Sequence, residues 1–145
     1  MTRVFVFGTL KRGFPLHRRG LSGARFLGRR RTVERYPMVV AGPRYAPMML
    51  DQPGAGRQVI GELYEVDDRT LRRLDALESV GRPGELRAVL LVERLGGGAA
   101  TPACAYMKSP RLVRPRHSGY LAAYRRDRRF IPPARHQPPA KHPAS

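Results

Sequence analysis

The sequence has no tryptophan, a single cysteine and no long uninterrupted run of apolar residues. One cysteine, Cys104, cannot form an internal disulfide, which excludes a disulfide-stapled scaffold. The residues around it, 103–106, are typical of a buried strand, so we expect an inert core thiol. Without an apolar run of about 20 residues no membrane-spanning helix is predicted. No secretory h-region follows the first residue, so the expected compartment is the cytoplasm.

Lysine and acidic residues are also scarce, whereas arginine is abundant. Lys11, Lys108 and Lys141 are the only lysines, 11 residues are acidic, and the formal net charge is +17. Such a charge is consistent with a nucleic-acid partner, and equally with a compositional bias towards arginine. The arginines are spread along the chain, and no zinc-finger spacing or RNP-like aromatic sequence is present. Non-specific adhesion to nucleic acid at low salt is expected under either explanation.

The sequence offers no cluster of metal ligands. Its four histidines, His17, His117, His136 and His142, are scattered, and two of them lie near the C-terminus. A metal centre needs several such side chains at a characteristic spacing. We therefore predict no metal site.

The first strand and the loop after it are the segment around which the chain is organised. Residues 3–7 form a short apolar run of β-branched and aromatic residues, which is typical of a buried strand. The loop that follows, residues 8–13, contains two glycines, one hydroxyl and two cations. Its backbone N–H groups are suited to binding an anion, although an ordinary β-turn has the same composition. No Gly-Lys-Ser/Thr follows, so a nucleotide-binding loop is excluded.

Short strands with one clear helix predict an α+β domain with a small curved or closed sheet. Besides the first strand we expect strands over residues 24–33, 36–40, 48–50, 58–66, 86–95 and 102–107. Residues 60–66 alternate with period two, so Glu62 shares a face with Ile60 and Tyr64. Glu62 is then either an inward carboxylate that needs a partner such as arginine, or a surface glutamate at a strand bend.

The predicted helix, residues 67–78, ends on the glutamate that is the candidate acid/base. Asp67 is the N-cap residue, and Leu71, Leu74 and Leu77 form the apolar stripe. Glu78 shares that buried face, at the helix C-terminus, where the dipole disfavours a carboxylate. Burial and dipole both raise its pKa, as a general acid/base requires. The alternative is a glutamate that turns outward or pairs with Arg82 or Arg87.

The C-terminal part of the chain has a different composition. Residues 118–129 are expected to form a last helix, with Tyr120, Leu121 and Tyr124 on one side. Residues 132–145 are polar and rich in proline, which is typical of a disordered basic tail. The expected organisation is therefore one domain over residues 1–131 followed by a tail over residues 132–145.

The opening segment Val-Phe-Val-Phe-Gly-Thr-Leu-Lys-Arg-Gly, with Pro15 and His17 after it, resembles the start of the gamma-glutamylcyclotransferase superfamily. The branch that it resembles most is the gamma-glutamylamine cyclotransferases. Similar segments follow in the same order at residues 36–37, 61–66 and 74–78, and at Arg87 with its strand. Together they cover about the first two-thirds of the chain. The resemblance implies a compact, mixed or antiparallel β-barrel with flanking helices.

The resemblance also implies a cofactor-independent enzyme that cyclises the gamma-glutamyl group of a gamma-glutamyl amine to 5-oxoproline and releases the amine. Glu78 matches the glutamate that is catalytic in the family. The same comparison implies that the substrate, a small gamma-glutamyl compound, is bound by seven residues: Phe7, Gly8, Thr9, Leu10, Tyr36, Pro37 and Arg87. No partner other than this small molecule is implied, and the oligomeric state is left open.

Two positions depart from the family pattern. Phe7 replaces a tyrosine that usually precedes Gly-Thr-Leu, and Glu85 stands where a tyrosine is common. The hydroxyl lost at Phe7 either alters a hydrogen bond in the site or has no effect, whereas a glutamate at position 85 either changes the acceptor amine or indicates weakened activity. Two other hypotheses therefore stand beside the enzyme. The first is a basic nucleic-acid-binding module on the same fold, and the second is a family member that binds gamma-glutamyl compounds without turnover.

Overall fold

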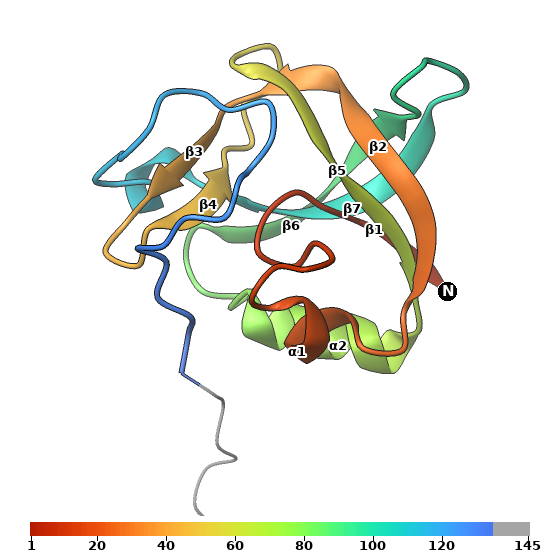
Figure 1. Cartoon of the computed structure of the whole chain (residues 1–145), viewed down its shortest axis with the longest axis horizontal. Coiled ribbons are helices and arrows are strands. Elements are labelled where there is room, and N and C mark those ends of the chain that lie inside the picture. The colour runs from red at the N-terminus through yellow and green to blue at the C-terminus, as the bar shows by residue number, and fades with distance from the viewer. Residues whose placement is uncertain (135–145) are drawn as a thin grey trace, which may run out of the picture.

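The computed structural model describes residues 1–134, which form a barrel with helices packed outside it (Figure 1). In chain order the elements are β1 (Thr2–Val6), α1 (His17–Leu21), β2 (Arg25–Tyr36), β3 (Met38–Ala41), β4 (Ala46–Met49), β5 (Arg57–Val66), α2 (Asp68–Leu77), β6 (Glu85–Glu93), β7 (Thr101–Lys108) and a 3-10 turn (Pro110–Leu112). Within these residues no helix has the length and hydrophobicity needed to span a membrane.

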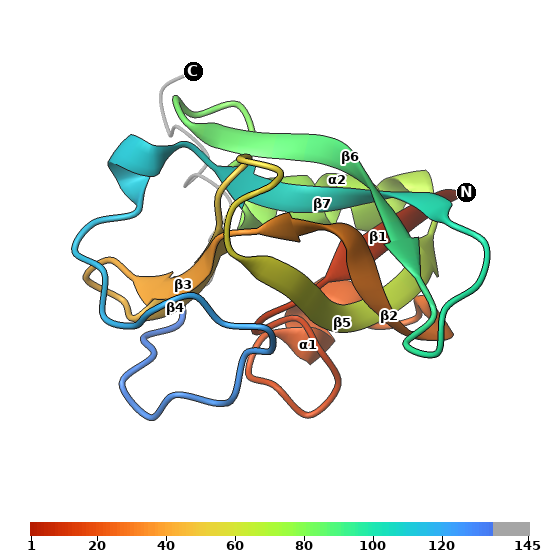
Figure 2. The same cartoon turned by 90° about the horizontal axis from the view of Figure 1, so that it is seen from above.

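Five strands close the barrel in the order β1-β5-β2-β6-β7. Every neighbouring pair is antiparallel except β1 and β7, which run parallel where Val4 lies opposite Cys104. Strands β3 and β4 form a separate two-stranded sheet beside one end of the barrel (Figure 2). The predicted α+β barrel with flanking helices is confirmed.

The faces of β5 are set by the space available inside the barrel. Val59, Gly61 and Leu63 are buried and face inward. A Cβ on Gly61 would lie 2.3 Å from the Val6 carbonyl oxygen, so only glycine allows β1 to approach this closely. Glu62 therefore lies on the outer face, where it is half-buried and accepts hydrogen bonds from the Arg12 N–H and the Tyr64 hydroxyl. Of the two alternatives, the surface position is observed, and within residues 1–134 no arginine side chain pairs with Glu62.

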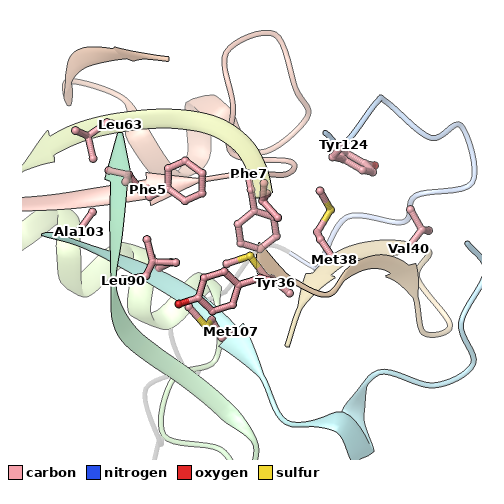
Figure 3. Close-up of a cluster of buried hydrophobic side chains, with 14 residues drawn as sticks. Phe5, Phe7, Tyr36, Met38, Val40, Leu63, Leu90, Ala103, Met107 and Tyr124 are labelled. Carbon is pink, nitrogen blue, oxygen red and sulfur yellow. The ribbon is translucent and has the colours of Figure 1, made fainter. Parts of the chain in front are cut away.

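Apolar side chains fill the barrel and continue into the β3–β4 sheet (Figure 3). Their burial is the main source of stability, at roughly 25 cal/mol for each Å² of apolar surface removed from water. The buried members of this core are Phe5, Phe7, Tyr36, Met38, Val40, Met49, Val59, Leu63, Leu90, Val92, Ala103, Ala105, Met107 and Tyr124.

Helices α1 and α2 lie side by side against the outside of the barrel (Figure 1). They cover outward-facing residues of three strands, among them Val4, Tyr64 and Tyr106. Leu74 of α2 is fully buried in this second core, as the apolar stripe predicts. The side chain of Asp67 accepts a hydrogen bond from the Thr70 N–H at 2.8 Å, which confirms Asp67 as the N-cap residue.

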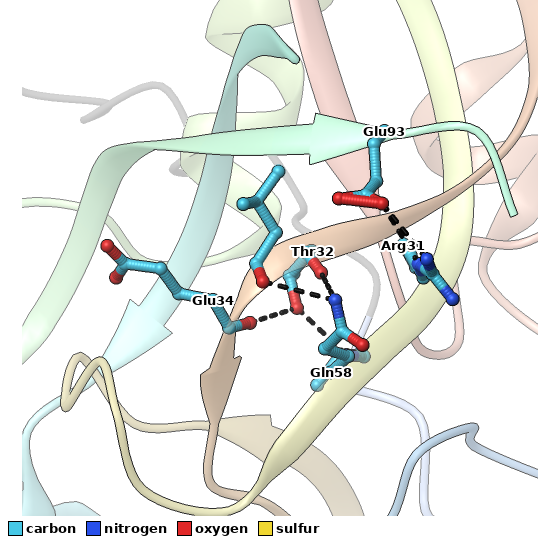
Figure 4. Close-up of polar contacts among 7 residues, drawn as sticks. Arg31, Thr32, Glu34, Gln58 and Glu93 are labelled. Atoms are coloured by element: carbon cyan, nitrogen blue, oxygen red, sulfur yellow. Dashed lines mark hydrogen bonds and ion pairs between the residues drawn. The ribbon is translucent and has the colours of Figure 1, made fainter. Parts of the chain in front are cut away.

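Strand β2 extends three residues beyond the predicted end and bends over β5 at an irregular register (Figure 4). The backbone hydrogen bonds between the two strands are interrupted there, and the side chain of fully buried Thr32 takes their place. Its hydroxyl donates to the Glu34 carbonyl and accepts from the Val59 N–H. The Gln58 amide donates to the carbonyls of Thr32 and Val33, each at 3.1 Å. Side chains thus satisfy backbone groups that a regular strand pair would bond directly.

The predicted helix over residues 118–129 is wrong. The segment is irregular, and its backbone bonds to strands instead of to itself. The Leu121 N–H donates to the Met38 carbonyl at 2.8 Å, and the Ala122 carbonyl accepts from the Ile60 N–H at 2.7 Å. Tyr124 is buried against the barrel core. The tertiary contacts therefore override a weak helical pattern.

The expected burial of Cys104 is also not observed. The residue is half-buried in β7, on the side of the strand opposite to buried Ala103 and Ala105. Because the barrel interior takes only alternate residues of β7, Cys104 falls on the outer face.

The predicted tail begins at Pro132, and residues 135–145 lie outside the described part of the chain. Arg19 donates to the Pro133 carbonyl at 2.8 Å, whereas Phe130 packs against the outer core. A chain shortened after Ile131 is expected to lose no more than about 1 kcal/mol of stability, because Arg19 contacts the removed residues only through one part-buried hydrogen bond and one long, exposed one. Thermal unfolding measures this. A chain shortened after Arg129, which also loses Phe130, is the control and should melt clearly lower. A large loss on removing only residues 132–145 would show that the tail is docked.

Candidate active site

One pocket brings the first loop, the end of α2 and strand β7 together beside the β3–β4 sheet. Its lining includes the end of β1 and the segment after it, the last three residues of β4, and three polar side chains, one at the C-cap of α2 and two on β7, that sequence analysis did not group. The lining residues are Phe5, Val6, Phe7, Gly8, Thr9, Leu10, Pro47, Met48, Met49, Glu78, Tyr106 and Lys108. Among residues 1–134, no group of three His, Cys, Asp or Glu side chains is placed to hold a metal ion.

The loop after β1 presents unused backbone donors to this pocket. Gly8, Thr9 and Leu10 are buried, yet none of their N–H groups donates a hydrogen bond within residues 1–134. The carbonyl groups of Gly8 and Thr9 accept from Lys11 and Leu16, at 3.1 and 2.9 Å, which fixes the loop. Buried N–H groups are almost always bonded in native proteins. Three adjacent exceptions at a pocket indicate a site for an oxygen-bearing ligand.

Gly8 is required in this loop because β4 approaches it closely. A Cβ at position 8 would lie 2.5 Å from the Pro47 Cγ, within a distance that real contacts do not reach. Any larger residue would push the β3–β4 sheet away or move the loop. The glycine therefore sets the width of the pocket between the loop and β4.

The end of α2 directs Glu78 towards the loop. Glu78 is the C-cap residue, and Ser79 follows with a left-handed φ of 57°. The Val80 N–H donates to the Asp75 carbonyl and the Ser79 N–H to the Ala76 carbonyl, at 2.9 and 3.1 Å. This is a Schellman motif with serine where glycine is preferred. The helix thus ends abruptly at the pocket wall, with Glu78 part of the lining.

Glu78 has the electrostatic environment of a general acid/base. Burial raises the pKa of its carboxyl group, Lys108 opposes this shift, and Glu85 adds to it. Within the described residues its carboxylate accepts no hydrogen bond and forms no ion pair. The alternative interpretation, a structural pair with Arg87, is not observed because Arg87 pairs with Asp75.

Arg87 does not line the pocket but holds Asp75, which in turn binds the pocket residue Tyr106. Its Nη1 donates to both carboxylate oxygens of Asp75, at 2.9 and 2.7 Å, and the Tyr106 hydroxyl donates to Asp75 Oδ1 at 2.8 Å. Burial and the bond to Asp75 raise the pKa of Tyr106, so its hydroxyl stays protonated. Arg87 is absent from the pocket lining, while Tyr106 belongs to it. The cluster fixes Tyr106 and the last turn of α2 relative to β6 and β7.

The structure brings together five of the eight predicted site residues. Glu78, Phe7, Gly8, Thr9 and Leu10 all line the pocket. Tyr36 belongs to the barrel core, and the Pro37 carbonyl accepts a bond from the Leu50 N–H, so both residues connect β2 to the β3–β4 sheet beside the site.

Tyr106 and Lys108 are lining residues that sequence reasoning did not single out. Both are on β7, two positions apart, so they share the face that Cys104 also occupies. This alternation was visible in the sequence. The position of this face relative to α2 could not be predicted from the sequence.

Replacement of Ser79 by glycine is expected to stabilise the protein by up to about 1 kcal/mol. A left-handed conformation costs an L-residue roughly 1–2 kcal/mol, and the greater freedom of unfolded glycine removes part of the gain. Urea unfolding of Ser79→Gly and Ser79→Ala provides the comparison, because alanine keeps the Cβ and should gain nothing. Equal stability changes in the two variants would contradict the assignment of backbone strain at this position.

The chain is similar to known proteins over most of its length. The family model described as "Gamma-glutamyl cyclotransferase, AIG2-like" matches residues 4–126. Gamma-glutamylaminecyclotransferase of Homo sapiens is 47% identical over 110 residues, which cover 71% of this chain and 72% of that protein. The Bos taurus protein of the same name is 54% identical over 80 residues, covering 52% of this chain and 48% of its own length.

Solved structures extend the similarity to the fold. The crystal structure of an AIG2-like protein from Mus musculus has a TM-score of 0.80 at 35% identity and covers 94% of this chain and 99% of that chain. An uncharacterized protein from Pyrococcus horikoshii has a TM-score of 0.57 at 26% identity, covering 84% of this chain and 86% of its own. The resemblance noted from the opening segment is confirmed, and the chain belongs to the gamma-glutamyl cyclotransferase, AIG2-like family.

Proposed function

We propose that the protein is a cofactor-independent cyclotransferase that converts a gamma-glutamyl amine to 5-oxoproline and a free amine. One observation carries the proposal: the unbonded N–H groups of residues 8–10 and the carboxylate of Glu78 line the same pocket. The first is suited to a carbonyl oxygen that becomes negative, and the second to a group that gains and loses a proton. The relatives named gamma-glutamylaminecyclotransferase support this reaction.

The reaction begins when Glu78 accepts a proton from the substrate's α-ammonium group, which leaves a neutral amine. The amine nitrogen attacks the γ-carbonyl carbon, a five-membered ring closes, and the carbonyl oxygen becomes an oxyanion. The loop N–H groups at Gly8, Thr9 and Leu10 bind that oxyanion. When the oxyanion collapses, the bond from the γ-carbon to the leaving nitrogen breaks, and Glu78 returns a proton to that nitrogen. The Glu78 carboxylate then accepts the second proton of the ring nitrogen, which leaves the neutral lactam of 5-oxoproline, and passes that proton to the departing amine, which leaves as an ammonium ion.

Orientation is the enzyme's other contribution. The nucleophile and the carbonyl belong to one molecule, so the pocket has only to hold the substrate in its folded, ring-forming conformation. The rigid loop provides one fixed wall for this, and Tyr106, which Asp75 and Arg87 hold in place, provides another.

A panel of gamma-glutamyl amines, assayed for release of 5-oxoproline, tests the proposal. The panel should include glutathione, gamma-glutamyl-lysine and simple gamma-glutamyl alkylamines, and we expect release from at least one. Binding of these compounds without release would indicate a member that has lost turnover. Absence of both, together with salt-dependent binding of nucleic acid, would favour a nucleic-acid module.

A further inference from the structure

Two charged side chains line the pocket, and they have opposite signs. Glu78 is the anion and Lys108 is the cation. The head of a gamma-glutamyl group is an α-amino acid, with an ammonium and a carboxylate on one carbon. Glu78 receives the ammonium in the reaction proposed above, so the lysine faces the place where the carboxylate must lie. Complementary charges of this kind determine which ligands are accepted.

Lys108 has unused hydrogen-bonding capacity. Its side chain is only 18% exposed and forms an ion pair with Glu85, its cross-strand neighbour on β6. An ammonium group carries three N–H donors. Within residues 1–134 the Nζ of Lys108 makes one hydrogen bond, to Glu85, which leaves two donors without a partner. Because Lys108 lines the pocket, a ligand oxygen is the natural acceptor for them.

Glu85 fixes the position of this ammonium group. It begins β6 directly opposite Lys108 and is itself 17% exposed, yet it is absent from the pocket lining. Burying an ammonium group is costly unless it has a counter-ion. The ion pair with Glu85 therefore holds the Lys108 side chain at the pocket wall.

We propose that Lys108 is a specificity-determining residue, whose ammonium binds the α-carboxylate of the gamma-glutamyl group, and that Glu85 is its positioning residue. This inference rests on the proposed function. It assigns the two substrate oxygen sites separately: the loop N–H groups hold the γ-carbonyl oxygen, and Lys108 holds the carboxylate. A glutamate at position 85 would by itself repel a substrate carboxylate. The inference explains why Glu85 is nevertheless compatible with an acidic substrate, because Lys108 neutralises the charge of Glu85.

The test compares two substrates with the same leaving amine. One is the gamma-glutamyl amide, and the other is the 4-aminobutanoyl amide, which lacks only the α-carboxylate and cyclises to 2-pyrrolidinone. Hydrogen bonds to charged groups are worth enough to change kcat/KM by roughly 10- to 150-fold. Lys108→Met should therefore reduce the wild-type preference for the gamma-glutamyl substrate by that factor and change kcat/KM for the other substrate little. Lys108→Arg should keep most of the preference.

Arg31→Met is the matched control. Arg31 lies on β2 and forms an ion pair with Glu93, which is on β6 as Glu85 is. Neither Arg31 nor Glu93 lines the pocket. Its substrate preference should equal that of the wild type. If Lys108→Met is poorly folded because Glu85 is left unpaired, the double variant Glu85→Gln/Lys108→Met removes both charges and tests the same preference.

Calorimetric binding of 5-oxoproline and 2-pyrrolidinone separates this inference from the proposed function. If the wild type binds 5-oxoproline more tightly and Lys108→Met loses that difference, Lys108 binds the carboxylate even if no substrate is turned over. If Lys108→Met lowers kcat equally for both substrates and keeps the preference, the lysine stabilises the oxyanion and the inference is overturned. Absence of both turnover and binding in the wild type would overturn the inference and the proposed function together.

Discussion

Glu78→Gln is expected to reduce turnover of a gamma-glutamyl amine by roughly a hundredfold to ten-thousandfold, the usual contribution of a general acid/base. Glutamine keeps the volume and the capacity for hydrogen bonds, but it cannot exchange a proton. The affinity for substrate should change far less, because the lost interaction belongs to the transition state. Steady-state kinetics of 5-oxoproline release measure both quantities.

The stability of Glu78→Gln distinguishes a catalytic from a structural glutamate. Because the carboxylate is buried without a partner among residues 1–134, its removal should leave the melting temperature unchanged or raise it. Glu65→Gln, a change on β5 outside the pocket lining, is the control and should retain full activity. Unchanged turnover in Glu78→Gln would remove Glu78 from the mechanism. A large loss of stability would instead assign Glu78 a structural role.

The pH dependence follows from the raised pKa of Glu78. The base form is needed for the first proton transfer, so kcat/KM should rise with pH through a pKa above the ordinary carboxyl value of 4.5. A carboxyl group with a raised folded-state pKa holds its proton more tightly in the folded protein. Its contribution to the free energy of unfolding is therefore present at low pH and is lost as pH rises through that pKa.

The raised pKa of Glu78 also predicts how the stability of Glu78→Gln compares with that of the wild type as pH changes. Glutamine does not titrate, so the stability of Glu78→Gln relative to the wild type should increase with pH above about 4.5 and then level off. Urea unfolding of both proteins across this range provides the measurement. A stability difference that decreased with rising pH would show that the carboxylate is stabilised by a partner in the folded state.

Thr9→Pro is expected to abolish binding of 5-oxoproline and with it turnover. Proline removes the central of the three N–H groups that face the pocket and adds its ring where a substrate oxygen is expected to lie. The fold should persist, because that N–H has no partner within residues 1–134 and the Thr9 carbonyl still accepts from Leu16 at 2.9 Å. Calorimetry with 5-oxoproline and thermal unfolding test the two statements.

Thr9→Ala is the control for the side chain at this position. It keeps the N–H group and removes only the hydroxyl, so it should bind 5-oxoproline much more tightly than Thr9→Pro does. If the proline variant bound 5-oxoproline as well as the wild type, the loop would have no part in recognition. If both variants lost binding equally, the hydroxyl and not the backbone would be the recognition element.

Local sequence patterns predicted the elements that are stabilised by their own neighbours. Helix α2 was predicted because Asp67 satisfies the first free N–H groups and because Leu71, Leu74 and Leu77 recur at helical spacing. The first strand was predicted from its apolar run. In each case one short segment contains most of the physical cause of its structure.

Predictions failed or stayed open where the cause lies in a distant segment. Residues 118–129 have a helical distribution of apolar residues, but Met38 and Ile60 offer backbone groups that this segment satisfies instead. Glu62 alternates with the residues of β5, yet alternation does not say which face is inside. Gly61 and the close approach of Val6 decide that, and they place Glu62 outside.

The sequence by itself determined the class of fold, the loop with exposed backbone donors and the glutamate at the end of the helix, because these depend on local composition and periodicity. Only the tertiary structure decided that loop and glutamate face one pocket, since closure of the barrel brings β1 beside β7 and α2 beneath both. The pairing of Glu85 with Lys108 and of Asp75 with Arg87 likewise depends on strand register. Register is fixed by packing across the whole barrel, and no single segment contains it.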